Sequence, residues 1–338
     1  MFGVNLTEYD KKVYREKLAD FLPPKFIDVH VHLWEPGTKR PGQKGAARWP
    51  SLVADSQTYE DMDLSFQQLF PGKKVAKVVF GSPSCRLDVV NSYVQKIIQE
   101  QRVRALYCTS WDTTPAEIKK ALDAGFVGIK PYQNNSPPDI PAAELQIFNF
   151  LTHEQLKFMD EVGGIVMLHI PRAGRLRDPV NLAQLVEIDR KYPRAKVIVA
   201  HVGRAYCPED IGEAMSILKN TKNLMFDFSA NTLDLAMEKC IEAVGTKRVM
   251  FGSDMPYTKM RMYRICESGN YVNVVPRGLY GDVSGDSHMR ETDESDITLF
   301  MYEELLAFRR AALRLGLTQD DINDIMYNNA SEYFGIEL

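Results

Sequence analysis

Residues 26–32 read Phe-Ile-Asp-Val-His-Val-His, a short run rich in β-branched and aromatic side chains. Seven more short apolar runs follow, at residues 74–80, 103–109, 126–131, 164–170, 196–201, 223–229 and 248–254. Near-continuous apolar content is typical of strands that are buried on both faces, as in a parallel sheet covered by helices. The sequence therefore predicts eight parallel strands.

Helix signals separate the predicted strands. Residues 114–117 (Thr-Pro-Ala-Glu) and 152–155 (Thr-His-Glu-Gln) are capping boxes, and Asp178-Pro179 begins a further helix. More helical segments are expected at residues 86–101, 208–219, 231–244, 300–315 and 318–329. Strands that alternate with helices in this way predict a (β/α)8 TIM barrel. A doubly wound sheet is the weaker alternative, since it would carry a glycine-rich fingerprint after its first strand.

Two long insertions interrupt the alternation. Residues 34–60 and 255–298 are rich in glycine, proline and polar residues and follow the first and the last strand. In a closed barrel these strands are neighbours, so we expect the insertions to meet at the catalytic face, as a lid or a partner contact. We expect one domain over residues 1–338. Its parts are a barrel core at about 26–256, an insertion at 257–298 and C-terminal helices at 299–338.

Composition excludes several classes of protein. Of the 338 residues, 45% are hydrophobic and 25% are charged, which is typical of a globular chain and excludes wholesale disorder. Lysine and arginine number 41 against 45 acidic residues, a net charge of −4, so the basic excess needed for nucleic-acid binding is missing. We expect no membrane partner either, since no apolar run approaches about 18 residues.

The N-terminal sequence and the cysteines bear on location. The first eight residues lack a basic region followed by an apolar core, so no secretory signal is predicted. The five cysteines are an odd number without a Cys-x-x-Cys pair, which suggests reduced thiols in a cytoplasmic protein and excludes a cysteine-based zinc site.

Four of the six histidines lie at the carboxyl ends of predicted strands: His30, His32, His169 and His201. His30 and His32 are two residues apart on a strand, so their side chains leave the same face. A lone strand histidine is usually a hydrogen-bonded core residue. Four of them, together with Asp254 at the end of the last strand, favour a site for zinc, manganese, iron or cobalt.

These motifs resemble the amidohydrolase superfamily, and within it the amidohydrolase-related TIM-barrel metal-dependent hydrolases and decarboxylases. The resemblance covers nearly the whole chain. It is carried by residues 26–32, His169 in Met-Leu-His, His201 in Ala-His-Val-Gly, residues 251–256 (Phe-Gly-Ser-Asp-Met-Pro) and residues 328–334 (Asn-Asn-Ala-Ser-Glu-Tyr-Phe).

The resemblance implies a role for each site residue. His30 and His32 match the metal ligands of strand one, and His169 matches the ligand of strand five. Asp254 matches the carboxylate of strand eight, which contacts the metal and accepts a proton from the attacking water. His201 matches the histidine of strand six, which binds a second ion in two-metal members and polarises the substrate or handles a proton in others.

Lys130 ends strand four, where two-metal members often carry a carboxylated lysine that bridges the ions. The alternative is an ordinary lysine whose ammonium binds substrate or pairs with Asp28 or Asp254. We expect one divalent ion, with Zn²⁺ ahead of Mn²⁺, Fe²⁺ or Co²⁺, and favour less a second ion held with carboxylated Lys130.

Several cations follow the predicted strands and suggest an anionic substrate. Arg172 and Arg204 each come three residues after a candidate site histidine, and an arginine can bind a carboxylate through paired hydrogen bonds. Loop arginines are also common on any protein surface. Trp34 follows strand one and is a candidate wall for a substrate pocket, although aromatic residues at strand ends also serve ordinary packing.

The sequence thus predicts a metal-dependent hydrolase that activates water to cleave a small anionic ester, lactone or amide. The alternative is a metal-dependent nonhydrolytic decarboxylase of a carboxylated aromatic or muconate-like substrate. A noncatalytic barrel is disfavoured, because three histidines and one carboxylate leave a position on the metal open to a water molecule. Asp227 is expected to be structural, and a homodimer is a possible assembly.

Overall fold

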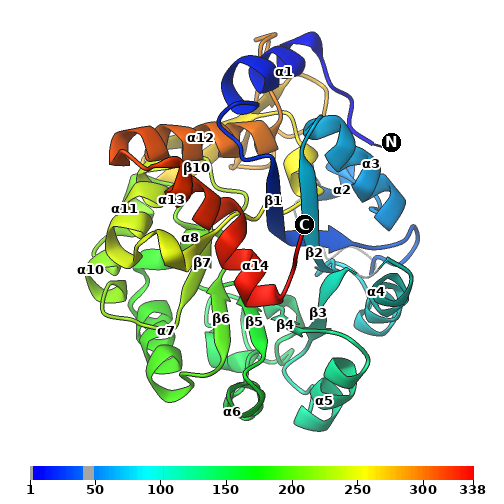
Figure 1. The fold of residues 1–338 in the computed structure, drawn as a ribbon, viewed down its shortest axis with the longest axis vertical. Helices are drawn as coiled ribbons and strands as arrows, with labels where there is room; N and C mark the ends of the chain where they lie inside the picture. The colour runs from blue at the N-terminus through cyan, green and yellow to red at the C-terminus, as the bar shows by residue number, and fades with distance from the viewer. Residues whose placement is uncertain (1–2, 41–48, 102) are drawn as a thin grey trace.

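The computed structural model describes residues 3–40, 49–101 and 103–338, and Figure 1 shows a ring of strands surrounded by helices. Eight parallel strands pair in chain order from β1 to β8. Their bounds are β1 Lys25–Leu33, β2 Lys74–Gly81, β3 Arg104–Thr109, β4 Gly128–Pro131, β5 Ile165–Leu168, β6 Lys196–Val199, β7 Met225–Asp227 and β8 Val249–Met250. The predicted (β/α)8 TIM barrel is confirmed.

Hydrogen bonds join the first strand to the last strand and the segment that follows it. The amide of Val29 donates to the carbonyl of Phe251 at 3.1 Å, and the amide of Asp254 donates to the carbonyl of His30 at 2.8 Å. The amide of His32 donates to the carbonyl of Met255 at 2.8 Å. This closure places the end of β8 directly beside the two histidines of β1.

Helices cover the outside of the barrel. The longer ones are α3 Tyr59–Leu69, α4 Leu87–Gln101, α5 Pro115–Asp123, α6 His153–Val162, α7 Pro179–Lys191, α11 Asp234–Val244 and α12 Phe300–Leu315. Thr114 and Thr152 form the predicted capping boxes, and Asp178 caps α7. The helix predicted over residues 208–219 is instead two short ones, α9 Pro208–Ile211 and α10 Ala214–Leu218, because Gly212 lies between them with φ 47°. The predicted tail helix comprises α13 Gln319–Asn323, a π-helical turn and α14 Asn329–Phe334.

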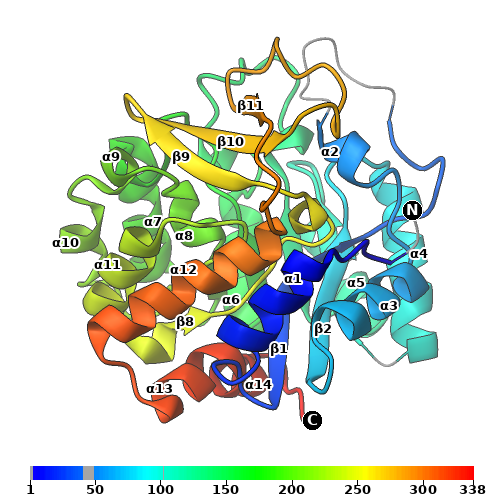
Figure 2. The same cartoon turned by 90° about the horizontal axis from the view of Figure 1, so that it is seen from above.

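The segment after β8 is not a plain loop. It forms a three-stranded sheet of β9 Tyr263–Glu267, β10 Asn270–Pro276 and β11 Met289–Thr292. Ser268 and Gly269 connect β9 and β10 with φ values of 50° and 75°, as a two-residue hairpin turn requires. Figure 2 shows this sheet lying over one side of the barrel.

The two insertions meet. Trp49 and Val53 of α2 Trp49–Val53 pack against a cluster that contains Met260 and Tyr280 from the segment after β8. Residues 41–48 of the first insertion lie outside the described residues, as do residues 1–2 of the N-terminal segment.

The expectation that all cysteines are reduced is wrong for one pair. Cys207 and Cys266 form a disulfide with their Cα atoms 5.7 Å apart, whereas Cys85, Cys108 and Cys240 are free and buried. The two partners are 59 residues apart in sequence, and the insertion brings them together. Disulfides persist mainly in oxidising compartments, so the cysteine pattern no longer supports a cytoplasmic location.

No helix in residues 3–40, 49–101 and 103–338 combines the length and apolar character needed to cross a membrane.

Candidate metal centre and active site

A cavity of about 150 Å³ opens at the carboxyl ends of the barrel strands. It is lined by His30, His32, Pro83, Lys130, Tyr132, Gln133, Asn134, His169, His201, Asp254 and Tyr257. All four histidines predicted from strand ends, together with Lys130 and Asp254, therefore meet in one place. A cavity of this volume is large enough to hold a molecule of the size of benzene.

His30 is buried, and its two ring nitrogens have different partners. Nδ1 lies 3.0 Å from Oδ2 of Asp227, so Nδ1–H donates to that carboxylate. The lone pair of Nε2 then faces the cavity, 3.5 Å from Oδ1 of Asp254. Burial, helped by the positive charge of Lys130, lowers the pKa of His30 to about 3. His30 is thus a neutral imidazole in the form that binds metals.

His32 and Asp254 lie close enough to share a proton or a cation. Its Nδ1 lies 3.2 Å from the carbonyl oxygen of Gly81, which can only accept, so Nδ1 carries a proton. The same carbonyl accepts from the Tyr132 hydroxyl at 2.5 Å. In neutral His32 the unprotonated Nε2 would face Oδ1 of Asp254 at 2.9 Å, and two acceptors at this distance need a second proton or a cation.

The donor atoms of His30, His32 and Asp254 all lie within 4.8 Å of one another. Burial alone would raise the pKa of Asp254, but the hydrogen bond with His32 and the neighbouring imidazoles lower it to about 2. The carboxylate is therefore charged at neutral pH. Two imidazoles and one carboxylate are ligands suited to a divalent transition metal, so these residues fit such an ion.

His201 enters the cavity through an unusual backbone segment. His201, Val202, Gly203 and Arg204 all have positive φ, between 47° and 61°. Non-glycine residues in this conformation cost free energy, and such segments cluster at functional sites. Nδ1 of His201 lies 2.9 Å from the carbonyl oxygen of Ser229, so it carries the proton and Nε2 has a free lone pair. Burial lowers the pKa of His201 and keeps the ring neutral.

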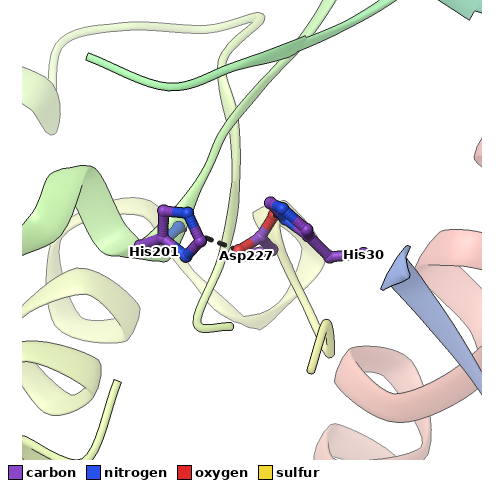
Figure 3. A group of neighbouring side chains, drawn as sticks. All are labelled: His30, His201 and Asp227. Carbon is purple, nitrogen blue, oxygen red and sulfur yellow. Dashed lines mark hydrogen bonds and ion pairs between the residues drawn. The ribbon is translucent and has the colours of Figure 1, made fainter. Parts of the chain in front are cut away.

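Asp227 links the two histidines, and Figure 3 shows it between His201 and His30. One oxygen accepts from Nδ1 of His30, and the other accepts from the amides of His201 and Ser229 at 2.9 Å and 3.1 Å and from the Ser229 hydroxyl. Burial alone would raise the pKa of Asp227, but interactions with His30 and His201 hold it below its ordinary value. Asp227 was expected to be structural. Its position at the end of strand seven is the sequence signal for its role at the site.

His169 lines the same cavity, but it is not one of the three residues whose donor atoms all lie within 4.8 Å of one another. Its ring packs edge-on against that of His201, with 5.3 Å between the ring centres. Nδ1 of His169 is buried and has no hydrogen-bond partner in the part of the chain that the structure describes. Burial lowers its pKa well below the ordinary value. His169 is therefore a neutral ring with an unused nitrogen at the cavity.

Lys130 is fully buried at the end of β4. Its amine lies 3.4 Å from Nε2 of His30 and 4.9 Å from the ring centre of Phe80. Burial lowers the pKa of Lys130 to about 8, opposed by the negative charges of Asp227 and Asp254. The amine thus remains mainly charged at pH 7, within the cavity.

The other predicted substrate residues do not line this cavity. Arg172 donates through Nε to both carboxylate oxygens of Asp178 at 3.0 Å. Arg204 donates to the carbonyls of Ile170, Pro171 and Arg172 and so supports the segment after β5. Trp34 is buried behind Tyr257, with 6.1 Å between the stacked rings. Pocket walls come instead from Tyr132 and Tyr257, of which the second lies in the insertion after β8.

Gly252 explains how β8 approaches β1 so closely. A Cβ atom at this position would lie 2.8 Å from Cβ of His30 and 3.3 Å from Cβ of Ser229. Both neighbours belong to the site, so a larger residue at Gly252 would displace them.

Comparisons with known proteins agree with this architecture. A family model described as amidohydrolase matches residues 27–265. A search of curated proteins gives no match.

Solved structures with the same fold include hydrolases and decarboxylases. A probable 2-pyrone-4,6-dicarboxylic acid hydrolase from Acinetobacter baumannii is 18% identical, with a TM-score of 0.55 over 92% of this chain and 99% of that chain. The 2,6-dihydroxybenzoate decarboxylase from Rhizobium is 12% identical, with a TM-score of 0.55 over 93% and 99%. The 5-carboxyvanillate decarboxylase from Sphingomonas paucimobilis is also 12% identical, with a TM-score of 0.57 over 93% and 100%. At these identities the similarity concerns the fold. The family model covers more than half of the chain, which therefore belongs to the amidohydrolase family.

Proposed function

We propose that the chain is a metal-dependent hydrolase that activates water to cleave a small anionic ester, lactone or amide. The observation that carries the proposal is the convergence of Nε2 of His30, Nε2 of His32 and Oδ1 of Asp254 at one wall of the cavity. Such a set of acceptors, with each imidazole oriented by an acceptor behind it, is what a divalent ion requires.

We propose one zinc ion per chain, with manganese, iron or cobalt as alternatives, held by His30, His32, His169 and Asp254. A bound divalent ion lowers the pKa of a water molecule to about 7 and polarises a carbonyl group. A second ion with carboxylated Lys130 is less favoured, since the lysine amine already lies within hydrogen-bond reach of His30 at 3.4 Å.

Asp254 acts as the proton acceptor. Because its pKa is lowered to about 2, the carboxylate is charged at neutral pH and can take a proton from water as the water attacks a carbonyl carbon. Asp254 can then deliver this proton to the leaving oxygen or nitrogen.

His201 and Lys130 face the same cavity with opposite hydrogen-bonding capacity. His201 donates through Nδ1 to Ser229, so its Nε2 can accept a proton or bind a cation but cannot donate to an oxyanion. The Lys130 ammonium is a donor, and it can stabilise the developing oxyanion or hold an anionic substrate.

The second candidate is a nonhydrolytic decarboxylase of a carboxylated aromatic or muconate-like substrate. Lys130, placed among His30 and the rings of Phe80 and Tyr132, favours it because a buried ammonium beside aromatic walls can hold a ring carboxylate. Carbon dioxide release from carboxylated aromatics would favour this candidate, whereas acid release from lactones or esters would favour hydrolysis.

Metal content tests the proposal directly. The purified chain should contain about one equivalent of divalent metal, measured by plasma mass spectrometry, and the double change His30→Ala/His32→Ala should abolish it. Asp254→Asn should lower turnover of esters or lactones by about 100-fold or more, because it removes the proton acceptor. His153→Ala is the control, since His153 lies at the start of α6 outside the cavity. Full metal content in the double variant would overturn the ligand assignment.

A further inference from the structure

The disulfide between Cys207 and Cys266 joins the inserted sheet to the segment that carries His201. Cys207 comes six residues after His201 in the chain and directly precedes α9 Pro208–Ile211. Cys266 lies in β9, close to the hairpin turn that leads into β10. Figure 2 shows this hairpin reaching toward α9. The bond therefore connects a surface element with a segment that enters the active-site cavity.

The segment before Cys207 has a costly backbone conformation. The four residues from His201 to Arg204 have φ between 47° and 61°, and three of them are not glycine. Residues persist in this conformation only when the surrounding structure holds them there. At the start of the segment, the amide of His201 donates to Asp227 at 2.9 Å. At its end, the disulfide adds a covalent link to β9, so the bond helps to hold the segment in place.

Arg264 of the same hairpin contacts both segments that position the His201 ring. Its guanidinium carbon lies 4.6 Å and 4.7 Å from the ring centres of Tyr206 and Tyr271. Its Nη1 donates to the carbonyl of Ala230 at 3.0 Å. Ala230 directly follows the serine whose carbonyl accepts from Nδ1 of His201. The hairpin thus packs against the segment after β6, which contains His201, and against the segment after β7, which orients its ring.

One end of the disulfide is open to solvent. Cys266 is exposed, whereas Cys207 is fully buried. The free cysteines Cys85, Cys108 and Cys240 are buried as well. A thiolate from solution can therefore reach the sulfur of Cys266 far more easily than that of any other cysteine. Exposed disulfides are generally the labile and regulatory ones.

We propose that the disulfide between Cys207 and Cys266 is a redox switch, which keeps the active site in its working form while the bond is closed. The inference rests on the proposed function, since it concerns the regulation of the same site. Opening the bond releases the hairpin and allows residues 201–207 to leave the conformation with positive φ. Nε2 of His201 then loses its fixed place at the cavity, and turnover falls.

The reductant is a dithiol, and its reaction with the chain is a two-electron exchange. One thiolate of the dithiol attacks Sγ of Cys266, the bond between the two cysteines breaks, and Cys207 leaves as a thiolate that takes up a proton. The second thiol of the reductant then attacks the mixed disulfide and releases Cys266 as a thiol. Two electrons and two protons pass to the chain, and the dithiol becomes a disulfide.

Three of the proposed metal ligands are held in a different way. His30 and His32 belong to β1, which pairs with β2 along its length. The amide of Asp254 donates to the carbonyl of His30 at 2.8 Å. These bonds lie within the barrel and do not involve the hairpin. Opening the disulfide should therefore lower turnover without removing the metal.

Hydrogen exchange, followed by mass spectrometry on the full-length protein, tests the inference without turnover. The reporter is the backbone of residues 201–207, where the amides of His201 and Cys207 each donate to a carboxylate at 2.9 Å. Dithiothreitol should make this segment exchange about tenfold or more faster, because local opening sets the exchange rate. Reoxidation should restore the slow exchange. Residues 26–32 are the internal control and should exchange equally in both states.

Turnover and metal content are measured on the same samples. Turnover of an ester or lactone should fall about tenfold or more on reduction, because His201 is displaced from the cavity. The metal content should stay constant, which separates the switch from removal of the metal by the reductant.

Two variants separate the disulfide from other effects of the reductant. Cys266→Ser changes an exposed residue and should show fast exchange and low turnover without reductant, with no further change when dithiothreitol is added. Cys240→Ala is the matched control, since it removes a free buried thiol and should respond to the reductant as the wild type does. Cys207→Ala opens the same bond from its other end and decides the question if Cys266→Ser does not fold.

Equal exchange of residues 201–207 in the oxidised and the reduced wild type would overturn the inference. So would measurable turnover that is the same in both states, or a faster exchange on reduction that persists in Cys266→Ser. Absence of turnover in both states would contradict the proposed function alone, because the exchange rates still report whether the bond controls the segment. The two failures are therefore distinguishable.

Discussion

Asp227 is the residue on which the orientation of two histidines depends. It accepts hydrogen bonds from Nδ1 of His30 and from the backbone amide of His201, and Ser229 adds two more donors. These bonds leave the Nε2 lone pair of His30 directed at the cavity and fix the start of the segment with positive φ. A carboxylate behind a histidine ligand also increases the basicity of the ring, which strengthens metal binding.

Asp227→Asn should therefore weaken metal binding by about 10–100-fold. Asparagine has one acceptor oxygen where aspartate has two, so it cannot accept from both His30 and His201. The measurement is a metal titration against a competing chelator. Asp234→Asn is the control, because Asp234 lies at the start of α11, away from the cavity, and pairs with Arg310 of α12. Equal metal affinity in the wild type and in Asp227→Asn would show that this carboxylate does not orient the ligand.

The site residues differ in how well the sequence predicted them. His30, His32 and Lys130 could be placed because a strand fixes both the position and the direction of a side chain at its end. His201 and Asp254 lie beyond the ends of β6 and β8 and have positive φ, so the sequence predicted their place at the barrel mouth but not this backbone conformation. Arg172 and Trp34 lie in loops. There, closeness in sequence to a histidine does not determine where a side chain points. Arg172 turns to Asp178, and Trp34 packs behind Tyr257. The substrate role of these two residues stays a prediction without support from the cavity.

At the level of elements, all eight strands could be predicted because their apolar runs are buried on both faces. The inserted sheet was missed, since residues 255–298 are rich in polar residues and turn signals and carry no long apolar run. Its stability comes from partners that are distant in sequence. These include the arginine–tyrosine contacts and the disulfide between Cys207 and Cys266, which no local pattern reveals.

Reduction of this disulfide should loosen the inserted sheet. The bond closes a loop of 59 residues between the segment after β6 and β9, and such cross-links typically contribute about 2–4 kcal/mol. We expect a reductant to lower the melting temperature and to speed proteolysis within residues 263–276. Cys266→Ser should show the same changes without reductant and no further effect with it. If a reductant still lowered the melting temperature of Cys266→Ser, the stabilisation would not come from this disulfide.

At the scale of the whole molecule, the chain buries many ionisable groups that stay uncharged. Cys240 of α11 and the tyrosines Tyr14 and Tyr93 are buried against the apolar core, away from the cavity. Burial raises the pKa of each to about 12, from ordinary values near 9 for the thiol and 10 for the phenols. The folded chain thus keeps protons that the unfolded chain releases between pH 9 and pH 12.

Stability should consequently fall as the pH rises through this range. Each group whose pKa is raised by folding contributes stability that is complete below its unfolded pKa and is lost as the pH approaches its folded pKa. The loss is about 1.4 kcal/mol per pH unit for each group within its window. Urea unfolding at pH 8, 9, 10 and 11 measures this loss. Cys240→Ala should make the free energy of unfolding fall less steeply between pH 9 and pH 11, by about 1.4 kcal/mol per pH unit. An unchanged slope would mean that the Cys240 thiol is not protected in the folded chain, which contradicts its place in the core.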